Sequence, residues 1–443
     1  MRKTIRTTHR SRGRAARAVA VGLAATLATA LLGACSSDDE GDGGEGGDEQ
    51  ITLRVGVFGQ FGFEEAGLYE QYMEENPNIK IEQDSITDSG DYMTQLRTRL
   101  TQNSGLLDIQ AIEVGNIAEM ANELPDRWVD FNEYDVDASH IMGWKNDQAT
   151  SPDGRFIGLG TDIGPTGICY RTDYFEQAGL PTDRESVTEL FADWESYLEV
   201  GEQFAADGPE GVAYLDSAGG MFNAVVSAYE ERYYNAEGEI AYEETESVQT
   251  AWDLATQAAE SGLSSGLEQF QDDWNRAMAQ GDFATMPSCP AWMLGYIQTQ
   301  AGDAGEDVWD VAQSPTPSNW GGSFLGVPEA SEHKEEAVAL AQWLTAPEQQ
   351  ATFFTERASY PSSSTAQQDP AVLNATHPYF NDAPIGEIFS QASADIPSTH
   401  IGPYDQQIQD GITEGLLALE QNGLSPDEAW DDVVSALDNA VGE

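Results

Sequence analysis

The sequence predicts an α/β fold of two lobes, and three observations lead to this expectation. The chain has 443 residues, which is more than a single hydrophobic core usually holds. From residue 51 onward, short apolar runs with strand periodicity alternate with runs of helix periodicity, an order that is typical of βαβ units in a mostly parallel sheet. The third observation is a segment in which glycine and proline interrupt this alternation.

That segment, residues 154–184, reads GRFIGLGTDIGPTGICYRTDYFEQAGLPTDR. It contains two apolar strands, and between them one carboxylate, Asp162, is flanked by Gly160, Gly164 and Pro165. A polar residue among glycines and proline between two buried strands is typical of a chain that passes from one domain to another. We therefore predict the first crossover between the lobes here, with a ligand beside it and Asp162 as a candidate contact.

Two more segments predict a second and a third crossover. They are residues 319–323 (NWGGS) and residues 358–364 (ASYPSSS), both rich in glycine or serine. Three crossovers divide the chain into two discontinuous lobes. We expect lobe 1 to contain residues 51–162 and 322–360, and lobe 2 to contain residues 163–321 and 361–443.

The first part of the folded chain predicts a rim of candidate ligand-binding residues. Strands are expected at residues 51–58, 79–84 and 107–114, with helices at 64–76 and 92–102 between them. Ligands bind outside the carboxyl ends of the strands in such sheets, because those ends share one edge. The residues at these ends are Gln60, Phe61, Asp84, Glu113 and Asn116.

The later part of the chain continues the pattern. It predicts helices at residues 193–204 and 247–260, strands at 283–286 and 324–327, and helices that begin at the capping residues Ser331, Thr345 and Ser425. Asp216 lies in a small apolar segment, residues 214–222, and Trp292 lies between a strand and the following helix.

The first 34 residues predict a secretory signal. Seven Lys and Arg residues without a single acid precede an apolar run at residues 18–32, which is too short to remain as a membrane span. The run ends in Leu-Gly-Ala-Cys, which resembles the bacterial lipoprotein box and implies a diacylglycerol group on Cys35. The alternative is ordinary cleavage that leaves Cys35 free.

Residues 36–50 contain only Gly, Ser, Asp and Glu apart from Gln50, so they cannot bury a core. Together with Cys35 they predict a flexible tether with a reach of about 20 Å. Such a protein is anchored to a membrane without spanning it.

The charge of the chain excludes nucleic acid as a partner. Seven of the 20 Lys and Arg residues lie in the signal, so 13 remain against 77 Asp and Glu. A surface with this charge repels phosphate backbones. The acids are scattered over expected helix faces, which indicates a solvated surface and fits a saline habitat.

The cysteine and histidine residues indicate which disulfide and metal sites the chain can form. If Cys35 is lipidated, Cys169 and Cys289 form an even pair in an oxidising compartment, either as a disulfide or as two buried thiols. The four histidines outside the signal show no metal-ligand spacing, so no metal and no cofactor are expected.

Several segments in this order resemble one family. They are VFG, IEQDS, DIQAIEV, the segment at residues 154–184, GDFATMPSCPAWMLGYI, GGSFLGVPEASEHKEEAVALAQWLTAPEQQ and YPSSS. Over residues 50–443 the chain is similar to the extracellular solute-binding proteins, family 1, of ABC sugar importers, in their actinobacterial lipoprotein form. The resemblance implies a Venus-flytrap fold of type II, capture of a mono- or oligosaccharide, and delivery to the ABC permease subunits.

The resemblance also implies a monomer at the extracellular face of the cytoplasmic membrane, held by the lipid anchor at Cys35. The pairing of GICYRTD with SCPAWM is similar to binders of short cello- or xylo-oligosaccharides.

The chemistry of a sugar asks for the same residue types. A pyranose has apolar C–H faces, which stack on flat aromatic side chains, and a rim of hydroxyl groups, which carboxylates and amides bind. Trp292 and Trp320 are the main candidate platforms, and Phe61, Tyr360 and Tyr404 are further ones. The alternative for each is ordinary packing in the core or between the lobes.

The polar candidates are Glu113, Asn116, Asp162, Asp216, Asp84 and Gln60. For Asn116, Asp216 and Asp84 the alternative is a helix cap, and for Asp162 it is a hydrogen bond to backbone amides of the crossover.

Two other classes of function fit part of this pattern. A glycoside hydrolase could use Asp162 and Glu113 as its pair of carboxylates. No local motif would separate their pKa values, and the chain has no GxSxG motif for nucleophilic catalysis. A receptor for a non-sugar solute such as a polyamine would suit an acidic cleft. The aromatic residues near the crossovers favour sugar, and we do not expect an enzyme.

Overall fold

The structure is a computed structural model that describes residues 50–441. The predicted signal, Cys35 and the tether up to residue 49 lie outside the described residues. Within residues 50–441, no helix combines the length and the apolar character needed to cross a membrane.

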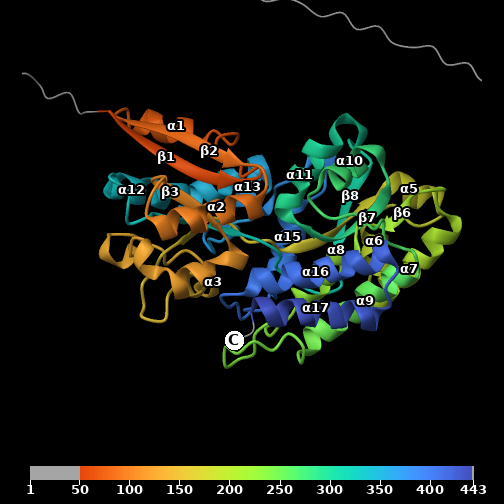
Figure 1. Cartoon of the computed structure of the whole chain (residues 1–443). Helices are drawn as coiled ribbons and strands as arrows, with labels where there is room; N and C mark the ends of the chain where they lie inside the picture. The colour runs from red at the N-terminus through yellow and green to blue at the C-terminus, as the bar shows by residue number, and fades with distance from the viewer. Residues whose placement is uncertain (1–49, 442–443) are drawn as a thin grey trace, which may run out of the picture. The chain divides into compact units, whose positions relative to one another are not determined.

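The first sheet has five strands in the order β2-β1-β3-β9-β4 (Figure 1). Strand β1 (Ile51–Phe58) pairs in parallel with β2 (Ile79–Ile86) and with β3 (Ile109–Glu113). Strand β9 (Ser323–Gly326) runs antiparallel to β3 and to β4 (Leu159–Gly160). The predicted parallel pairing therefore holds for the first three strands, whereas the strand that returns after the second crossover enters in the opposite direction.

The second sheet has four strands in the order β6-β7-β5-β8. Strand β5 (Thr166–Arg171) lies antiparallel between β7 (Phe283–Pro290) and β8 (Trp309–Gln313), and β6 (Ala213–Leu215) is parallel to β7. The expectation of a mostly parallel sheet is wrong here, because β5 meets strands that come back from the far side of this lobe.

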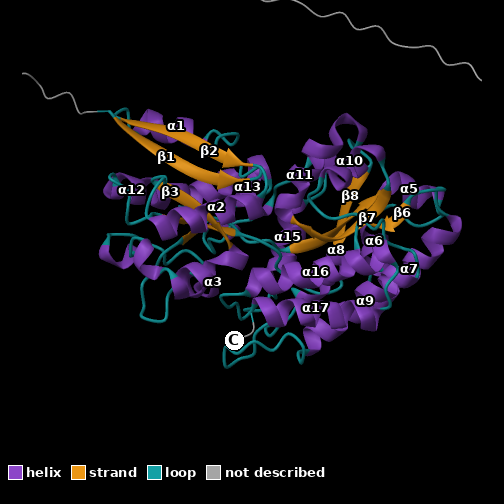
Figure 2. Cartoon of the chain, viewed as in Figure 1, coloured by secondary structure: helices purple, strands orange, loops and turns teal. Residues whose placement is uncertain are grey.

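Helices surround both sheets (Figure 2). Those near the first sheet include α1 (Leu68–Glu75), α2 (Ser89–Gln102), α3 (Val114–Glu123), α4 (Gly143–Gln148) and α12 (Lys334–Leu344). Helix α13 (Pro347–Arg357) also lies near the first sheet and contributes Phe353 to its core. The remaining helices are α5 (Thr172–Gln177), α6 (Arg184–Leu190), α7 (Trp194–Asp207), α8 (Ala218–Val226), α9 (Glu246–Glu260), α10 (Asp272–Gln280), α11 (Ala291–Ala301), α14 (Pro370–Leu373), α15 (Ile385–Ala394), α16 (Asp405–Asn422) and α17 (Pro426–Ala440).

Each sheet has its own hydrophobic core. One cluster forms around the first sheet and includes Leu53, Val55 and Val57 of β1, all fully buried. The second sheet is covered on both faces, because Ile168 of β5 belongs to one cluster and the next residue, Cys169, belongs to another. Neighbouring side chains of a strand point to opposite faces, so β5 contributes to both cores.

The predicted crossovers lie side by side. The Ile163 amide donates to the Tyr360 carbonyl at 2.9 Å, and the Trp320 amide donates to the Gly164 carbonyl at 2.9 Å. A Cβ atom at Gly164 would overlap the Trp320 carbonyl oxygen, which explains why glycine stands there. The α/β fold with two lobes and three crossovers is therefore confirmed.

A disulfide joins Cys169 to Cys289 on the neighbouring strands β5 and β7. The Cα atoms lie 5.6 Å apart, a usual spacing for a disulfide, and both side chains are buried. The bridge links residues 120 positions apart within one sheet, so it does not tie the two sheets to each other.

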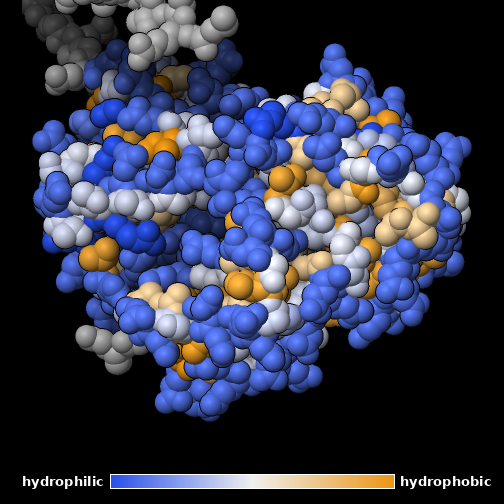
Figure 3. Space-filling view, turned by 45° about the vertical axis from the view of Figure 1, so that its right-hand side comes forward, coloured by the Kyte–Doolittle hydropathy of each residue, from blue (hydrophilic) through white to orange (hydrophobic). Residues whose placement is uncertain are grey.

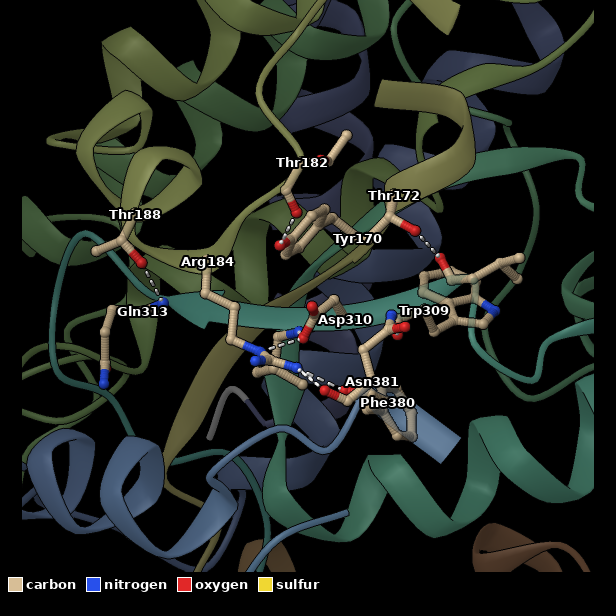
Figure 4. Close-up of polar contacts among 12 residues, drawn as sticks. Tyr170, Thr172, Thr182, Arg184, Thr188, Trp309, Asp310, Gln313, Phe380 and Asn381 are labelled. Atoms are coloured by element: carbon tan, nitrogen blue, oxygen red, sulfur yellow. Dashed lines mark hydrogen bonds and ion pairs between the residues drawn. The ribbon is translucent and has the colours of Figure 1, made fainter. Parts of the chain in front are cut away.

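A half-buried arginine, Arg184, connects the edge strand β8 to a distant segment (Figure 4). Arg184, at the start of α6, donates from Nε to Asp310 of β8 at 2.5 Å. Its terminal nitrogen donates to the carbonyl oxygens of Phe380 and Asn381, at 2.8 Å and 2.6 Å. The Asn381 amide then donates to the Trp309 carbonyl at 3.1 Å, which closes the connection back to β8.

Candidate functional site

A narrow cavity lies beside the second crossover, between that segment and the helices α3, α4 and α16. Its walls come from the β3–α3 junction, from α4, from residues 319–321, from residues 397–401 and from the first turns of α16. The cavity volume is about 20 Å³, close to the space that one water molecule needs. The cavity is polar as well as aromatic, because Glu113, Arg232 and Trp320 all line it.

Glu113 is the last residue of β3 and lies at the start of α3. Burial raises the pKa of its carboxyl to about 7, and the negative charge of Asp410 acts in the same direction. Arg232 and Arg97 oppose this shift. The carboxyl group can therefore either accept or donate a hydrogen bond near neutral pH.

Arg232 gives the cavity a positive charge. Its guanidinium is buried and forms an ion pair with Asp405, the first residue of α16, which is also buried. Within residues 50–441, its Nε has no hydrogen-bond partner. The cavity thus has an acceptor from β3 and a donor group from the segment after α8.

Asn116 forms a hydrogen bond with the Glu113 carboxyl group. Its amide donates to Glu113 at 3.3 Å, and its carbonyl oxygen accepts from Arg97 at 2.5 Å. Both ends of the side chain are used within the protein, and Asn116 does not line the cavity. It acts here as a positioning residue for Glu113.

Asp162 binds the crossover segments. Its Oδ1 accepts from the Thr161 hydroxyl at 2.6 Å and from the Ser323 amide at 2.9 Å. Burial raises the pKa of this carboxyl, whereas the nearby Lys145 lowers it. This arrangement matches the structural alternative weighed from the sequence, a hydrogen bond to crossover amides.

Lys145 lies under the same crossovers and is fully buried. Its ammonium group lies 3.8 Å from the centre of the Phe324 ring, and among the described residues it has no hydrogen-bond partner. Burial lowers the pKa of Lys145 to about 7, although Asp162 and Glu113 favour the charged form.

Two predicted platforms form one aromatic cluster. The Trp292 indole nitrogen donates to the Trp320 carbonyl at 3.0 Å, and the two ring centroids lie 5.3 Å apart. Both side chains are partly exposed, and Trp320 also lines the cavity. The cluster therefore continues from the cavity toward the start of α11.

The remaining predicted residues lie away from the cavity. Tyr360 is 1% exposed in the core, and its hydroxyl donates to Ser390. Asp216 is buried and accepts hydrogen bonds from Gln269 and Trp274.

The other three predicted residues do not line the cavity either. Gln60 is exposed. Phe61 packs against Phe58 and Phe63, and Tyr404 is 37% exposed just before α16.

Asp84 differs most from its expected position. Strand β2 continues to Ile86, so Asp84 lies within the strand and not at its end. Its carboxylate is half exposed and pairs with Arg54 of β1 at 2.5 Å. A cross-strand ion pair on an open sheet face accounts for this residue.

Sequence reasoning missed several residues of the site. Arg232 and the first residues of α16 line the cavity, and Phe270 packs on the tryptophan pair. Arg232 carried a usable signal, because basic residues are rare in this chain and this one stands within an aromatic run, ERYY. Phe270 carried none, since it lies in an irregular segment.

Solved structures share this fold. The structure titled extracellular solute-binding protein family 1 is 39% identical in sequence, has a TM-score of 0.76, and the match covers 88% of this chain and 99% of that one. The ABC transporter binding protein from B. animalis subsp. lactis Bl-04, in complex with β-1,6-galactobiose, is 19% identical with a TM-score of 0.75, over 88% of this chain and 97% of that one. At 19% identity, the second match shows the fold alone.

Sequence comparison gives the family. The lactose-binding protein of Rhizobium radiobacter is 26% identical over 321 residues, which are 70% of this chain and 72% of that protein. The family model described as bacterial extracellular solute-binding protein matches residues 67–380, well over half of the chain. The chain therefore belongs to the bacterial extracellular solute-binding proteins, which confirms the predicted family and a role in binding, not in catalysis.

Proposed function

We propose that this protein is the saccharide-binding component of an ABC importer, and that it binds a short oligosaccharide in the cavity beside the crossovers. The observation that carries the proposal is the meeting of an aromatic platform, Trp320, with a carboxyl group, Glu113, and a guanidinium, Arg232, in one cavity. The lactose-binding relative supports the same class of ligand.

The chemistry of the lining suits a pyranose. The face of Trp320 offers a flat apolar surface for the C–H face of a sugar ring, and Trp292 lies beside it with its ring plane turned by 56°. Glu113 would accept from ring hydroxyls, and Arg232 would donate to them. Gln406 and Gln409 of α16 also line the cavity and add amides that can do both.

Binding requires a wider cavity. A volume of about 20 Å³ cannot contain a pyranose ring, so the walls must separate before a saccharide enters. We infer that lobe 1 (51–162 and 322–360) and lobe 2 (163–321 and 361–443) move about the three crossovers. A saccharide that contacts both lobes then favours the closed arrangement by its differential affinity.

The remaining parts of the proposal concern the location of the protein. Lipidation of Cys35 would hold a monomer at the extracellular face of the cytoplasmic membrane, and the tether would let it reach the permease subunits. The sequence pattern at residues 18–35 supports this anchor. A mass measurement on the protein purified from membranes tests it, because loss of the signal and addition of a lipid at Cys35 change the mass in a defined way.

A ligand panel tests the proposed function. Thermal shift followed by calorimetry should be measured with lactose, β-1,6-galactobiose, cello- and xylo-oligosaccharides, glucose, and spermidine. We expect a rise in the thermal midpoint with at least one oligosaccharide, because a ligand that binds only the folded state stabilises it. Binding of spermidine without any saccharide would favour the polyamine alternative. Steady release of reducing ends from a bound oligosaccharide would contradict a pure binding role.

A further inference from the structure

Phe270 is an exposed aromatic residue in a strained conformation. Its side chain is 40% exposed, which is rare for a phenylalanine in this protein, and its φ angle is 67°. A left-handed backbone costs a bulky residue roughly 1 kcal/mol or more. A residue that is both strained and exposed does little for the stability of the fold, so its position needs another explanation.

The ring of Phe270 covers the tryptophan cluster. Its centroid lies 6.4 Å from Trp292 with the planes only 26° apart, and 6.0 Å from Trp320. Trp274 and Tyr296 contact it from the other sides, at 5.1 Å and 5.7 Å. Helices α10 and α11, which carry these residues and Trp292, lie side by side (Figure 1).

Hydrogen bonds to Asp216 hold the segment that carries Phe270. The Gln269 amide donates to the Asp216 carboxylate at 2.8 Å, and the Trp274 indole donates to the same oxygen at 3.0 Å. The Ser265 hydroxyl donates to the Asp216 backbone carbonyl. Residues on both sides of Phe270 are thus bound to one buried residue, and Phe270 projects from a fixed base.

We propose that Phe270 is a specificity-determining residue that forms the outer wall of the saccharide site, facing Trp292, and that a second sugar ring stacks between these two aromatic rings. The inference rests on the proposed function and extends it. The ring of Phe270 is nearly parallel to that of Trp292, as such a sandwich requires. Asp216 is then a positioning residue for this wall and not a ligand contact.

The distance between the Phe270 and Trp292 rings determines how far Phe270 must move to admit a sugar ring. A sugar ring in contact with an aromatic ring on each face needs about 7–8 Å between them, twice the optimal carbon–carbon separation. The two centroids lie 6.4 Å apart. Phe270 must therefore move outward by roughly 0.6–1.6 Å to reach that spacing. The wall favours ligands of two or more rings whose second ring has two apolar faces, such as a β-linked glucose, whose ring hydroxyls are all equatorial.

The test uses Phe270→Gly, Phe270→Tyr and the wild type with the oligosaccharide that the panel identifies. Glycine adopts a positive φ without strain. We therefore expect Phe270→Gly to keep a thermal midpoint close to that of the wild type while its affinity falls by about 10- to 100-fold. Phe270→Tyr should bind within about threefold of the wild type, because the ring is retained.

Two comparisons make the result specific. The matched control is Leu373→Ala, since Leu373 of α14 is also 40% exposed. The affinity of this variant for the oligosaccharide should equal that of the wild type. The affinity of Phe270→Gly for a monosaccharide should change less than its affinity for the oligosaccharide. Equal oligosaccharide affinity of Phe270→Gly and the wild type would overturn the inference. Failure of the wild type to bind any saccharide would instead overturn the proposed function.

Discussion

At the scale of single residues, Asp216 predicts a pH dependence of stability. Burial raises the pKa of its carboxyl to about 6, although Gln269 and Trp274 donate to it. The folded chain keeps this proton at pH values where the unfolded chain, with a pKa near 3.9, has lost it. The stabilisation is therefore complete below about pH 4 and is lost as the pH rises through 6.

We expect the thermal midpoint to fall between about pH 4.5 and pH 7, and Asp216→Asn to make this fall smaller. An asparagine still accepts hydrogen bonds from Gln269 and Trp274 but does not titrate. The general repulsion among the many acidic groups has the same sign, so the scans should be repeated at about 0.5 M salt, which screens exposed charges. An identical slope for the variant and the wild type at high salt would contradict the assignment to Asp216.

The residue scale also shows where sequence reasoning ends. Trp320 and Glu113 could be predicted as parts of the candidate site, because Glu113 ends an apolar strand and Trp320 stands next to the glycines of the second crossover. Asn116 and Asp216 could not be separated from ligand contacts, since a buried amide or carboxylate looks the same in sequence whether its partner is a sugar or another side chain. Their partners, Arg97 and Gln269, come from segments that only the folded chain brings near.

At the scale of elements, Arg184 connects strand β8 to residues 380–381. The Asp310 side chain is only 6% exposed, and burial raises its pKa to about 6 in spite of the arginine. Truncation of Arg184 leaves this carboxylate without its counter-ion and two carbonyl groups without a donor. We expect Arg184→Ala to lower the free energy of unfolding by about 3 kcal/mol, as measured by urea denaturation.

Arg54→Ala is the matched control for this prediction. Arg54 also pairs with a strand aspartate, Asp84, at the same distance of 2.5 Å, but both side chains are half exposed. An exposed pair contributes at most about 1 kcal/mol. Equal losses of stability in the two variants would mean that the connection at β8 is not the source of the effect.

The existence of most strands, and the parallel pairing of the first three, could be predicted from the sequence, but the directions of the later strands could not. Alternation of buried side chains is a local property, so β1, β2 and β3 were placed within a few residues. Whether β9 runs parallel or antiparallel to β3 depends on the side from which the chain returns after the second crossover. The end of β2 at Ile86 is set by pairing with β1, and for this reason Asp84 was expected two residues too close to the rim.

At the scale of the whole molecule, the surface follows the composition. Figure 3 shows hydrophilic residues over most of one face, with hydrophobic residues mainly in separate groups. This agrees with 77 acidic residues against 20 basic ones in a chain whose apolar side chains are largely buried in three hydrophobic clusters. The two lobes and three crossovers were predictable because they depend on chain length and on breaks in periodicity, whereas the width of the cavity depends on how the lobes pack.

The narrow cavity leads to a prediction for the whole molecule. Because about 20 Å³ cannot hold a saccharide, the ligand-free protein must reach wider arrangements for binding to occur. A ligand shifts the population toward the closed arrangement only by its differential affinity. We therefore expect a smaller radius of gyration, measured by small-angle X-ray scattering, when the oligosaccharide identified by the panel is saturating.

Trp320→Ala is the control for this measurement. It distinguishes a change in the radius of gyration caused by ligand binding from one caused by the effect of dissolved sugar on the solvent. This variant loses the platform that lines the cavity, so at the same sugar concentration its radius of gyration should stay at the ligand-free value. The Cys169–Cys289 disulfide lies within one sheet and leaves such movement free. An unchanged radius of gyration in the saturated wild type would mean that side chains alone open the cavity, and the crossovers would then not act as a hinge.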